Sequence, residues 1–230
     1  PDYQKRFGME TVRAQIINMH GFVEEIEDDV PEFEYAVIAT KTLPREDWLR
    51  IRVFSWMMDF LHFSKVFQIP IVLTHKLTGL GYRSIIESLM AASADFQTLK
   101  YINDFFWNKA QSIQSGNEEF CHSPQWLNIW WPANEYVLID LTTSSRLSEF
   151  YREAGKVLEK LWQEHEKENY LNVLWESVWL NQNLLKRPFL SGKKDVNLTY
   201  NILEFYKSAV QSESASIQES KSTISIDYDK

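Results

Sequence analysis

The sequence contains one cysteine and only seven glycines in 230 residues. A lone cysteine, Cys121, cannot form an intrachain disulfide, which fits a reducing compartment, so we expect a cytoplasmic protein. It also cannot by itself supply the ligands of an iron–sulfur cluster or a cysteine-based zinc site. The shortage of glycine argues against phosphate-binding loops and against a fold made mainly of strands and tight turns.

An excess of basic residues and long apolar runs are missing as well. The formal net charge is −8, and the densest charged run, EEIEDD at 24–29, is acidic. Nucleic-acid binding draws much of its affinity from a basic face that releases counterions, so we expect no nucleic-acid partner. No segment approaches the roughly 20 consecutive apolar residues of a membrane helix, so we expect no membrane span.

What the sequence does have is aromatic side chains, at 14% with nine tryptophans, and many segments of helical spacing. These features predict a mainly α, irregular helical domain with two or three short β-strands at its edges. The predicted helices are 9–19, 42–67, 69–79, 82–93, 96–113, 134–141, 145–170, 172–185 and 202–210. The predicted strands are 34–40, 195–200 and 222–228, of which the last two can pair.

Three regions follow from these patterns. Residues 1–30 are expected to be the end of a preceding domain or a linker helix, because the chain opens with Pro1 as if within a longer polypeptide. Residues 31–210 form the helical domain. Residues 211–230 are a polar, serine-rich tail that we expect to be partly disordered where it forms no strand.

The helix predicted at 42–67 carries the first candidate site. Five polar residues, spaced three or four apart with Trp48 and Val66, share one stripe of an otherwise apolar helix: Arg45, Arg52, Ser55, Asp59 and His62. Two interpretations stay open. The stripe is either the solvent face of a half-buried helix or a buried network in which Asp59 and His62 pair and partners satisfy the polar groups.

A second candidate is the segment CHSPQWLNIWWP at 121–132. Its tryptophans, Trp126, Trp130 and Trp131, either anchor a loop onto the helices or form an interface. Cys121 beside His122 suggests a nucleophile, but neighbours in sequence need not have the geometry that catalysis requires.

The segment VIATKTLPREDWLRIRVFSWMMDFLHF resembles the region that follows the barrel in cobalamin-binding radical S-adenosylmethionine enzymes. RFGMETVRAQI is similar to the end of such a barrel, and FYREAGKVLEKL and LTYNILEFYKSAV are similar to the helical tail of the family. The resemblance covers most of the chain, and its most distinctive part is REDW followed by a histidine.

The resemblance implies a parent enzyme that uses S-adenosylmethionine, an iron–sulfur cluster and possibly cobalamin. This chain lacks the CxxxCxxC and DxHxxG motifs of that family. No cofactor is therefore expected in this chain, and no catalytic residue carries over. The matching positions, Arg45, Asp47, Trp48 and His62, would pack against the missing N-terminal catalytic domain of the same polypeptide.

Three hypotheses follow. The first is an accessory docking domain of a radical enzyme that shapes or covers the substrate site and is inert alone. The second is a helical binding module that uses the tryptophan-rich segment for a protein or an apolar ligand. The third is a self-contained enzyme that uses Asp59 and His62.

Overall fold

The computed structural model describes residues 2–21, 32–187 and 190–229. The fold is mainly α, with short two-stranded antiparallel sheets, as the sequence predicts. The chain forms two compact units, Pro1–Met57 with Ile102–Leu138 (unit 1) and Met58–Tyr101 with Ile139–Lys230 (unit 2). The acidic run at 24–29 lies outside the described residues.

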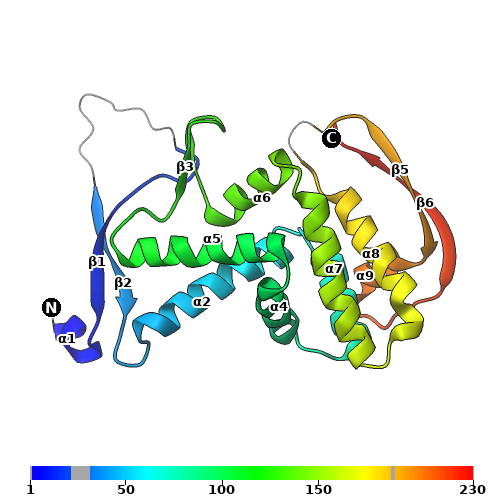
Figure 1. Cartoon of the computed structure of the whole chain (residues 1–230), viewed down its shortest axis with the longest axis horizontal. Coiled ribbons are helices and arrows are strands. Elements are labelled where there is room, and N and C mark those ends of the chain that lie inside the picture. Colours follow the sequence, from blue (N-terminus) through cyan, green and yellow to red (C-terminus); the bar gives the residue numbers. More distant parts are fainter. Residues whose placement is uncertain (1, 22–31, 188–189, 230) are drawn as a thin grey trace. The chain divides into compact units, whose positions relative to one another are not determined.

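Unit 1 combines two hairpins with helices (Figure 1). Its elements are α1 (Asp2–Phe7), β1 (Glu10–Gln15), β2 (Phe33–Ala39), and parts of α2 (Arg45–Met58), α5 (Gln97–Gln114) and α6 (Ala133–Thr143), together with β3 (Cys121–Ser123) and β4 (Ile129–Trp131). Helices α2 and α5 contact each other, since the Trp56 and Phe106 rings lie 5.8 Å apart. Gln114 Nε2 donates a hydrogen bond of 2.8 Å to the Arg45 carbonyl.

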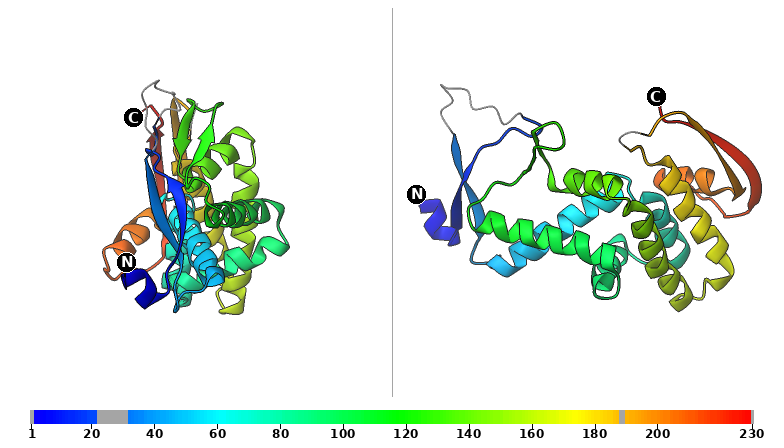
Figure 2. Two further views of the ribbon diagram at one scale, coloured as in Figure 1. Left: turned by 90° about the vertical axis from the view of Figure 1, so that its left-hand side faces the viewer. Right: turned by 45° about the horizontal axis from the view of Figure 1, so that its top comes forward.

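Unit 2 is a helical cluster with one hairpin (Figure 2). Besides the remaining parts of α5 and α6, its elements are the π-helix η1 (Asp59–Phe63), α3 (Gln68–Thr78), α4 (Tyr82–Ala91), η2 (Ala92–Ala94), α7 (Leu147–Glu164), η3 (Glu168–Tyr170), α8 (Leu171–Leu184), β5 (Lys193–Tyr200), α9 (Ile202–Val210) and β6 (Glu219–Asp227). Helix α3 contacts α4, α7, α8 and α9. Its side chains at 69–74 are all buried, so α3 is the centre of this unit.

Buried polar side chains fix the entry into α3. Asn181 Oδ1 accepts from the Ile69 N–H at 2.9 Å, and Asn181 Nδ2 donates to the carbonyls of Val66 at 2.8 Å and Lys65 at 3.1 Å. The Tyr151 hydroxyl donates to the same Val66 carbonyl at 2.6 Å. These bonds satisfy the Ile69 N–H in the first turn of α3 and two carbonyls of the irregular segment between η1 and α3.

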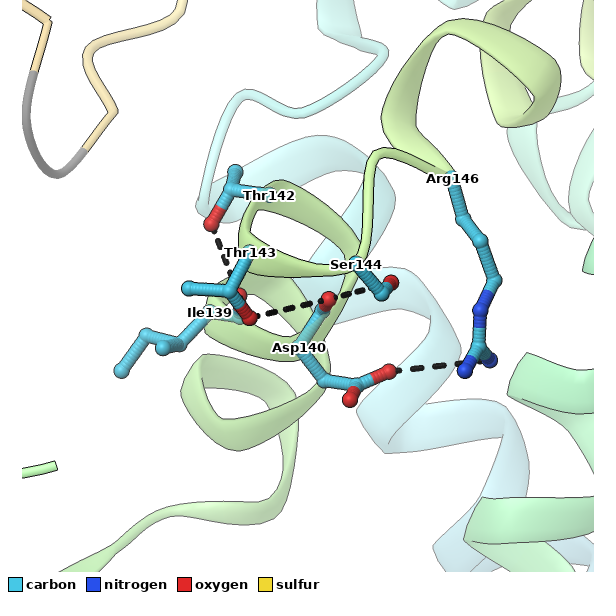
Figure 3. A network of polar contacts seen from close by, with 6 residues as sticks. All are labelled: Ile139, Asp140, Thr142, Thr143, Ser144 and Arg146. Carbon is cyan, nitrogen blue, oxygen red and sulfur yellow. Dashed lines mark hydrogen bonds and ion pairs between the residues drawn. The ribbon is translucent and has the colours of Figure 1, made fainter. Parts of the chain in front are cut away.

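A second polar network surrounds the end of α6 (Figure 3). The Thr142 hydroxyl donates to the Ile139 carbonyl at 2.8 Å, and the Asp140 carboxylate lies 3.7 Å from the Arg146 guanidinium. That guanidinium lies 4.3 Å from the centre of the Tyr101 ring. Burial and the hydrogen bond to Asp140 raise the pKa of Tyr101 to about 12. The network therefore joins three helix ends within unit 2.

One predicted helix is wrong. Residues 9–19 contain strand β1, which pairs antiparallel with β2 from Glu10 opposite Ala39 to Gln15 opposite Phe33. The helical spacing of Val12, Ile16 and Met19 suggested a helix, but pairing with β2 satisfies this backbone instead. Part of the region expected as the end of a preceding domain or linker is thus a strand of unit 1.

The predicted pairing of the two C-terminal strands is confirmed. Strand β5 pairs antiparallel with β6, with Asp195 opposite Ser225 and Val196 opposite Ile224. The helix predicted at 42–67 is interrupted, because α2 ends at Met58 and continues as η1. Its π-helical turn is wider, so the spacing of three and four residues no longer defines one stripe beyond Asp59.

Candidate functional site

The outer face of the β1–β2 hairpin is apolar although it is exposed. Phe33, Tyr35 and Val37 alternate along β2 and therefore point to the same face. Their exposed fractions are 41%, 69% and 40%. On the opposite face of the hairpin, Ala14 and Ile38 are buried. A hairpin with one face on the core normally presents polar side chains on the other, so these three are unusual.

The neighbouring strand adds one cation to this face. Arg13 lies opposite Tyr35, and its guanidinium carbon lies 3.6 Å from the centre of the Phe33 ring. Thr11 lies opposite Val37. Aromatic side chains and arginine are the residue types enriched in the energetically dominant parts of protein interfaces. We call Arg13, Phe33, Tyr35 and Val37 the hairpin face.

Exposed apolar side chains are concentrated in unit 1. Of thirteen large apolar residues that are exposed among the described residues, nine belong to this unit although it is the shorter one. They are Tyr3, Phe7, Ile16, Met19, Phe33, Tyr35, Val37, Ile51 and Leu127. Among them, Phe33, Tyr35 and Val37 share one face of β2, and such contiguous apolar surface marks interaction sites, whereas single exposed apolar residues are normal.

The predicted polar stripe is divided between the two units, and its unit 1 members have different environments. Arg45 forms an exposed ion pair of 2.7 Å with Glu10, and Ser55 is exposed. Arg52 pairs with Glu119 and lies 4.6 Å from the centre of the Trp56 ring. Burial lowers the pKa of Arg52, and its Nε has no hydrogen-bond partner among the described residues. Arg52 is therefore partly exposed, as expected for a solvent face, and partly buried with an acidic partner, as expected for a buried network.

Asp59 and His62 belong to unit 2, where both are half-buried. The Nδ1 atom of His62 is buried and has no hydrogen-bond partner in the described part of the chain. The His62 ring lies 5.3 Å from that of Tyr82, which stacks on His75 at 4.3 Å. Burial lowers the pKa of His62, which favours the neutral imidazole. His62 therefore packs in an aromatic cluster with Tyr82 and His75.

The three tryptophans of the second candidate site are half-buried and hold the β3–β4 hairpin. Trp131 Nε1 donates to the Trp126 carbonyl at 3.1 Å, and the Trp126 ring lies 4.8 Å from that of Tyr136. Trp130 packs on His122, its partner across the strands, at 5.2 Å. All three tryptophans therefore contribute to packing within unit 1.

Cys121 and His122 do not form a catalytic pair with each other. They are successive residues of β3, so their side chains point to opposite faces. His122 Nε2 hydrogen-bonds to Asn128 Oδ1 at 3.0 Å. Burial raises the pKa of the Cys121 thiol, which disfavours the thiolate needed for nucleophilic attack.

The residues present do not fit the iron–sulfur cluster of the family that the chain resembles. An iron–sulfur cluster is held by several cysteine thiolates, and this chain has one cysteine, whose thiol pKa is raised by partial burial. Within the described part of the chain, no three His, Cys, Asp or Glu side chains lie close enough together to hold a metal ion. No helix in residues 2–21, 32–187 and 190–229 combines the length and apolarity needed to cross a bilayer.

No protein-family model matches the chain, and no curated protein matches it significantly. Sequence reasoning missed the hairpin face, although it predicted a strand at 34–40. The available signal was the alternation of Phe33, Tyr35 and Val37 with Glu34 and Ala36. That alternation shows one apolar face, but the sequence does not say whether the rest of the protein covers it.

Proposed function

We propose that this chain is an accessory domain that docks through the hairpin face onto the catalytic domain of a radical S-adenosylmethionine enzyme and has no activity alone. The observation that carries the docking is the exposure of Phe33, Tyr35 and Val37 on one face of a two-stranded sheet. The nature of the partner rests on the resemblance of the segment at 37–63. The domain and its partner would operate in the cytoplasm.

Burial of the hairpin face explains its composition. Apolar surface removed from water contributes about 25 cal/mol per Å², so a partner that covers two aromatic rings and a valine gains several kcal/mol. Arg13 on the Phe33 ring supplies a cation next to the apolar patch. A carboxylate of the partner placed over this guanidinium would fix the orientation of the complex.

Site-specific photo-cross-linking tests this proposal in the full-length natural protein. A benzophenone amino acid replaces Tyr35, and the matched control replaces Tyr170, an exposed tyrosine of unit 2. We expect cross-links from position 35, and not from 170, to peptides of a domain that carries CxxxCxxC. The domain can belong to the same polypeptide or to another.

The two parts of the proposal fail separately. Absence of cross-links from position 35 would overturn the docking surface. Cross-links to a protein without CxxxCxxC would leave a docking surface but overturn the radical-enzyme partner. The isolated chain provides a further check, because stoichiometric incorporation of an iron–sulfur cluster into it would contradict an inert accessory role.

One observation favours the second candidate, a binding module that uses the tryptophan-rich hairpin for a protein or an apolar ligand. Leu127, at its tip, is 72% exposed and has φ of 62°, followed by Asn128 at 53°. This conformation is uncommon for leucine and costs about 1–3 kcal/mol, and such strain is frequent at ligand clamps. The benzophenone amino acid at position 127 decides between the candidates. Capture of a partner from 127 and not from 35 supports the second.

A further inference from the structure

Unit 2 contains a cavity of about 460 Å³ that the docking role does not use. Its walls come from the last turn of α3, from Tyr170 at the end of η3, from α9 and from the loop that follows α9. Leu77, Phe205, Ala209 and Ile217 supply apolar side chains. Sites for small ligands typically measure about 300–1,000 Å³ and combine an apolar lining with a few polar groups.

The loop over this cavity is fixed at both ends. Where α9 ends, Ser212 has φ of 61°, and the Glu213 N–H donates to the Ser208 carbonyl at 2.9 Å. At the other end, Asn201 Nδ2 donates to the Ser216 carbonyl at 3.0 Å, and Asn201 Oδ1 accepts from the Gln218 N–H at 2.9 Å. Hydrogen bonds therefore hold both ends of this bridging loop, and the cavity lies beneath a segment of fixed position.

The lining also contains a positive and a negative side chain, and hydrogen-bond donors, that have no partner within the described part of the chain. Lys76 and Glu213 both line the cavity, and neither side chain forms an ion pair or hydrogen bond within the described part of the chain. The Ser214 and Ser216 hydroxyls and the N–H groups at 214–216 likewise have no hydrogen-bond partner among the described residues. An ammonium, a carboxylate and several free donors, all on exposed residues, thus border one space that is half open to solvent and has both polar and apolar lining.

From this arrangement we infer that the cavity binds a small zwitterion, a free α-amino acid with an apolar side chain. The carboxylate of the ligand pairs with Lys76 and accepts hydrogen bonds from the bridging loop. Its ammonium pairs with Glu213, helped by the negative ends of α3 and α9, whose last turns reach the cavity. The side chain packs on Leu77 and Phe205. A ligand with only one charge leaves the opposite protein charge unpaired.

Titration of the full chain with L-leucine, followed by amide shifts in ¹H–¹⁵N NMR spectra, tests the inference. We expect saturable shifts at Ser214, Ala215 and Ser216. Two probes each lack one charged group: 4-methylpentanoate has no ammonium, and 3-methylbutylamine has no carboxylate. Each should bind at least about tenfold more weakly than L-leucine, because one charged hydrogen bond is lost.

Two variants and a control complete the test. Lys76→Met and Glu213→Gln should each weaken L-leucine binding by about tenfold or more, whereas Lys194→Met, an exposed lysine on β5, should not change it. Unchanged dispersion of the remaining amide signals shows that the variants are folded. Equal affinity of the singly charged probes, or no saturable shift with any standard amino acid, would overturn the inference.

Discussion

At the scale of residues, Asn181 is a buried polar side chain on which the stability of unit 2 depends. It is 3% exposed and bonds the Ile69 N–H in the first turn of α3 and two carbonyls just before that helix. Asn181→Ala removes the partner of the Ile69 N–H and of the Lys65 carbonyl, whereas the Val66 carbonyl keeps the Tyr151 hydroxyl, so we expect the free energy of unfolding to fall by about 1–3 kcal/mol. Urea denaturation measures the change. Asn172→Ala, at an exposed position of the same helix, is the matched control and should change it by less than about 0.5 kcal/mol.

His62 gives the pH dependence at this scale. Burial lowers its pKa in the folded state below the value of about 6.5 in an unfolded chain. The unfolded state therefore binds more protons as the pH falls through 6.5, and stability falls with it. His62→Gln removes this contribution. Between about pH 7.5 and pH 5, we expect the variant to lose less unfolding free energy than the natural chain. A His62 midpoint of 6.5 or above, from proton NMR, would contradict this.

At the scale of elements, helices with a regular apolar stripe could be predicted from the sequence. Helix α7 buries Phe150, Ala154, Leu158 and Trp162 on one side, as its spacing predicted. The pairing of β5 with β6 was also predictable, because both strands alternate and only nine helical residues and a loop separate them. In these elements, local spacing and tertiary packing favour the same conformation.

Other elements could not be predicted, for reasons that lie outside the local sequence. Val12, Ile16 and Met19 fit a helix, yet β1 forms because β2, about twenty residues later, pairs with it. The candidate site shows the same limit. The stripe from Arg45 to His62 follows from spacing, but the turn to a π-helix at Asp59 does not, and neither does the exposure of Tyr35. Exposure depends on what the rest of the molecule covers.

The contact between α7 and α8 allows a prediction about a helix pair. Gly155 is buried in α7, and a Cβ atom there would lie 2.5 Å from the Trp175 ring of α8. Alanine improves helix propensity by about 1 kcal/mol, but overpacking costs about 1–3 kcal/mol, so Gly155→Ala should destabilise the chain. Thermal unfolding measures this. Gly155→Ala combined with Trp175→Leu should recover the stability lost by crowding, and an additive double variant would refute steric conflict as the cause.

At the scale of the whole molecule, the two units differ in how many large apolar side chains they expose. Unit 2 buries a continuous core around α3, and its exposed large apolar residues are Phe63, Tyr170, Trp179 and Val210. They lie singly on η1, η3, α8 and α9. Unit 1 exposes nine such residues, with three side by side on β2. A molecule that binds a partner through one region should tolerate polar substitutions there better than in its core.

This asymmetry predicts how the isolated chain behaves in solution. The triple variant Phe33→Ser, Tyr35→Ser and Val37→Thr should bind about half as much of a hydrophobic dye, or less, because it removes the contiguous patch. It should also precipitate at a higher ammonium sulfate concentration. The matched triple Phe63→Ser, Trp179→Ser and Val210→Thr removes the same number of exposed apolar side chains from scattered positions. If both triples changed dye binding equally, the hairpin face would be ordinary apolar surface and the docking proposal would lose its basis.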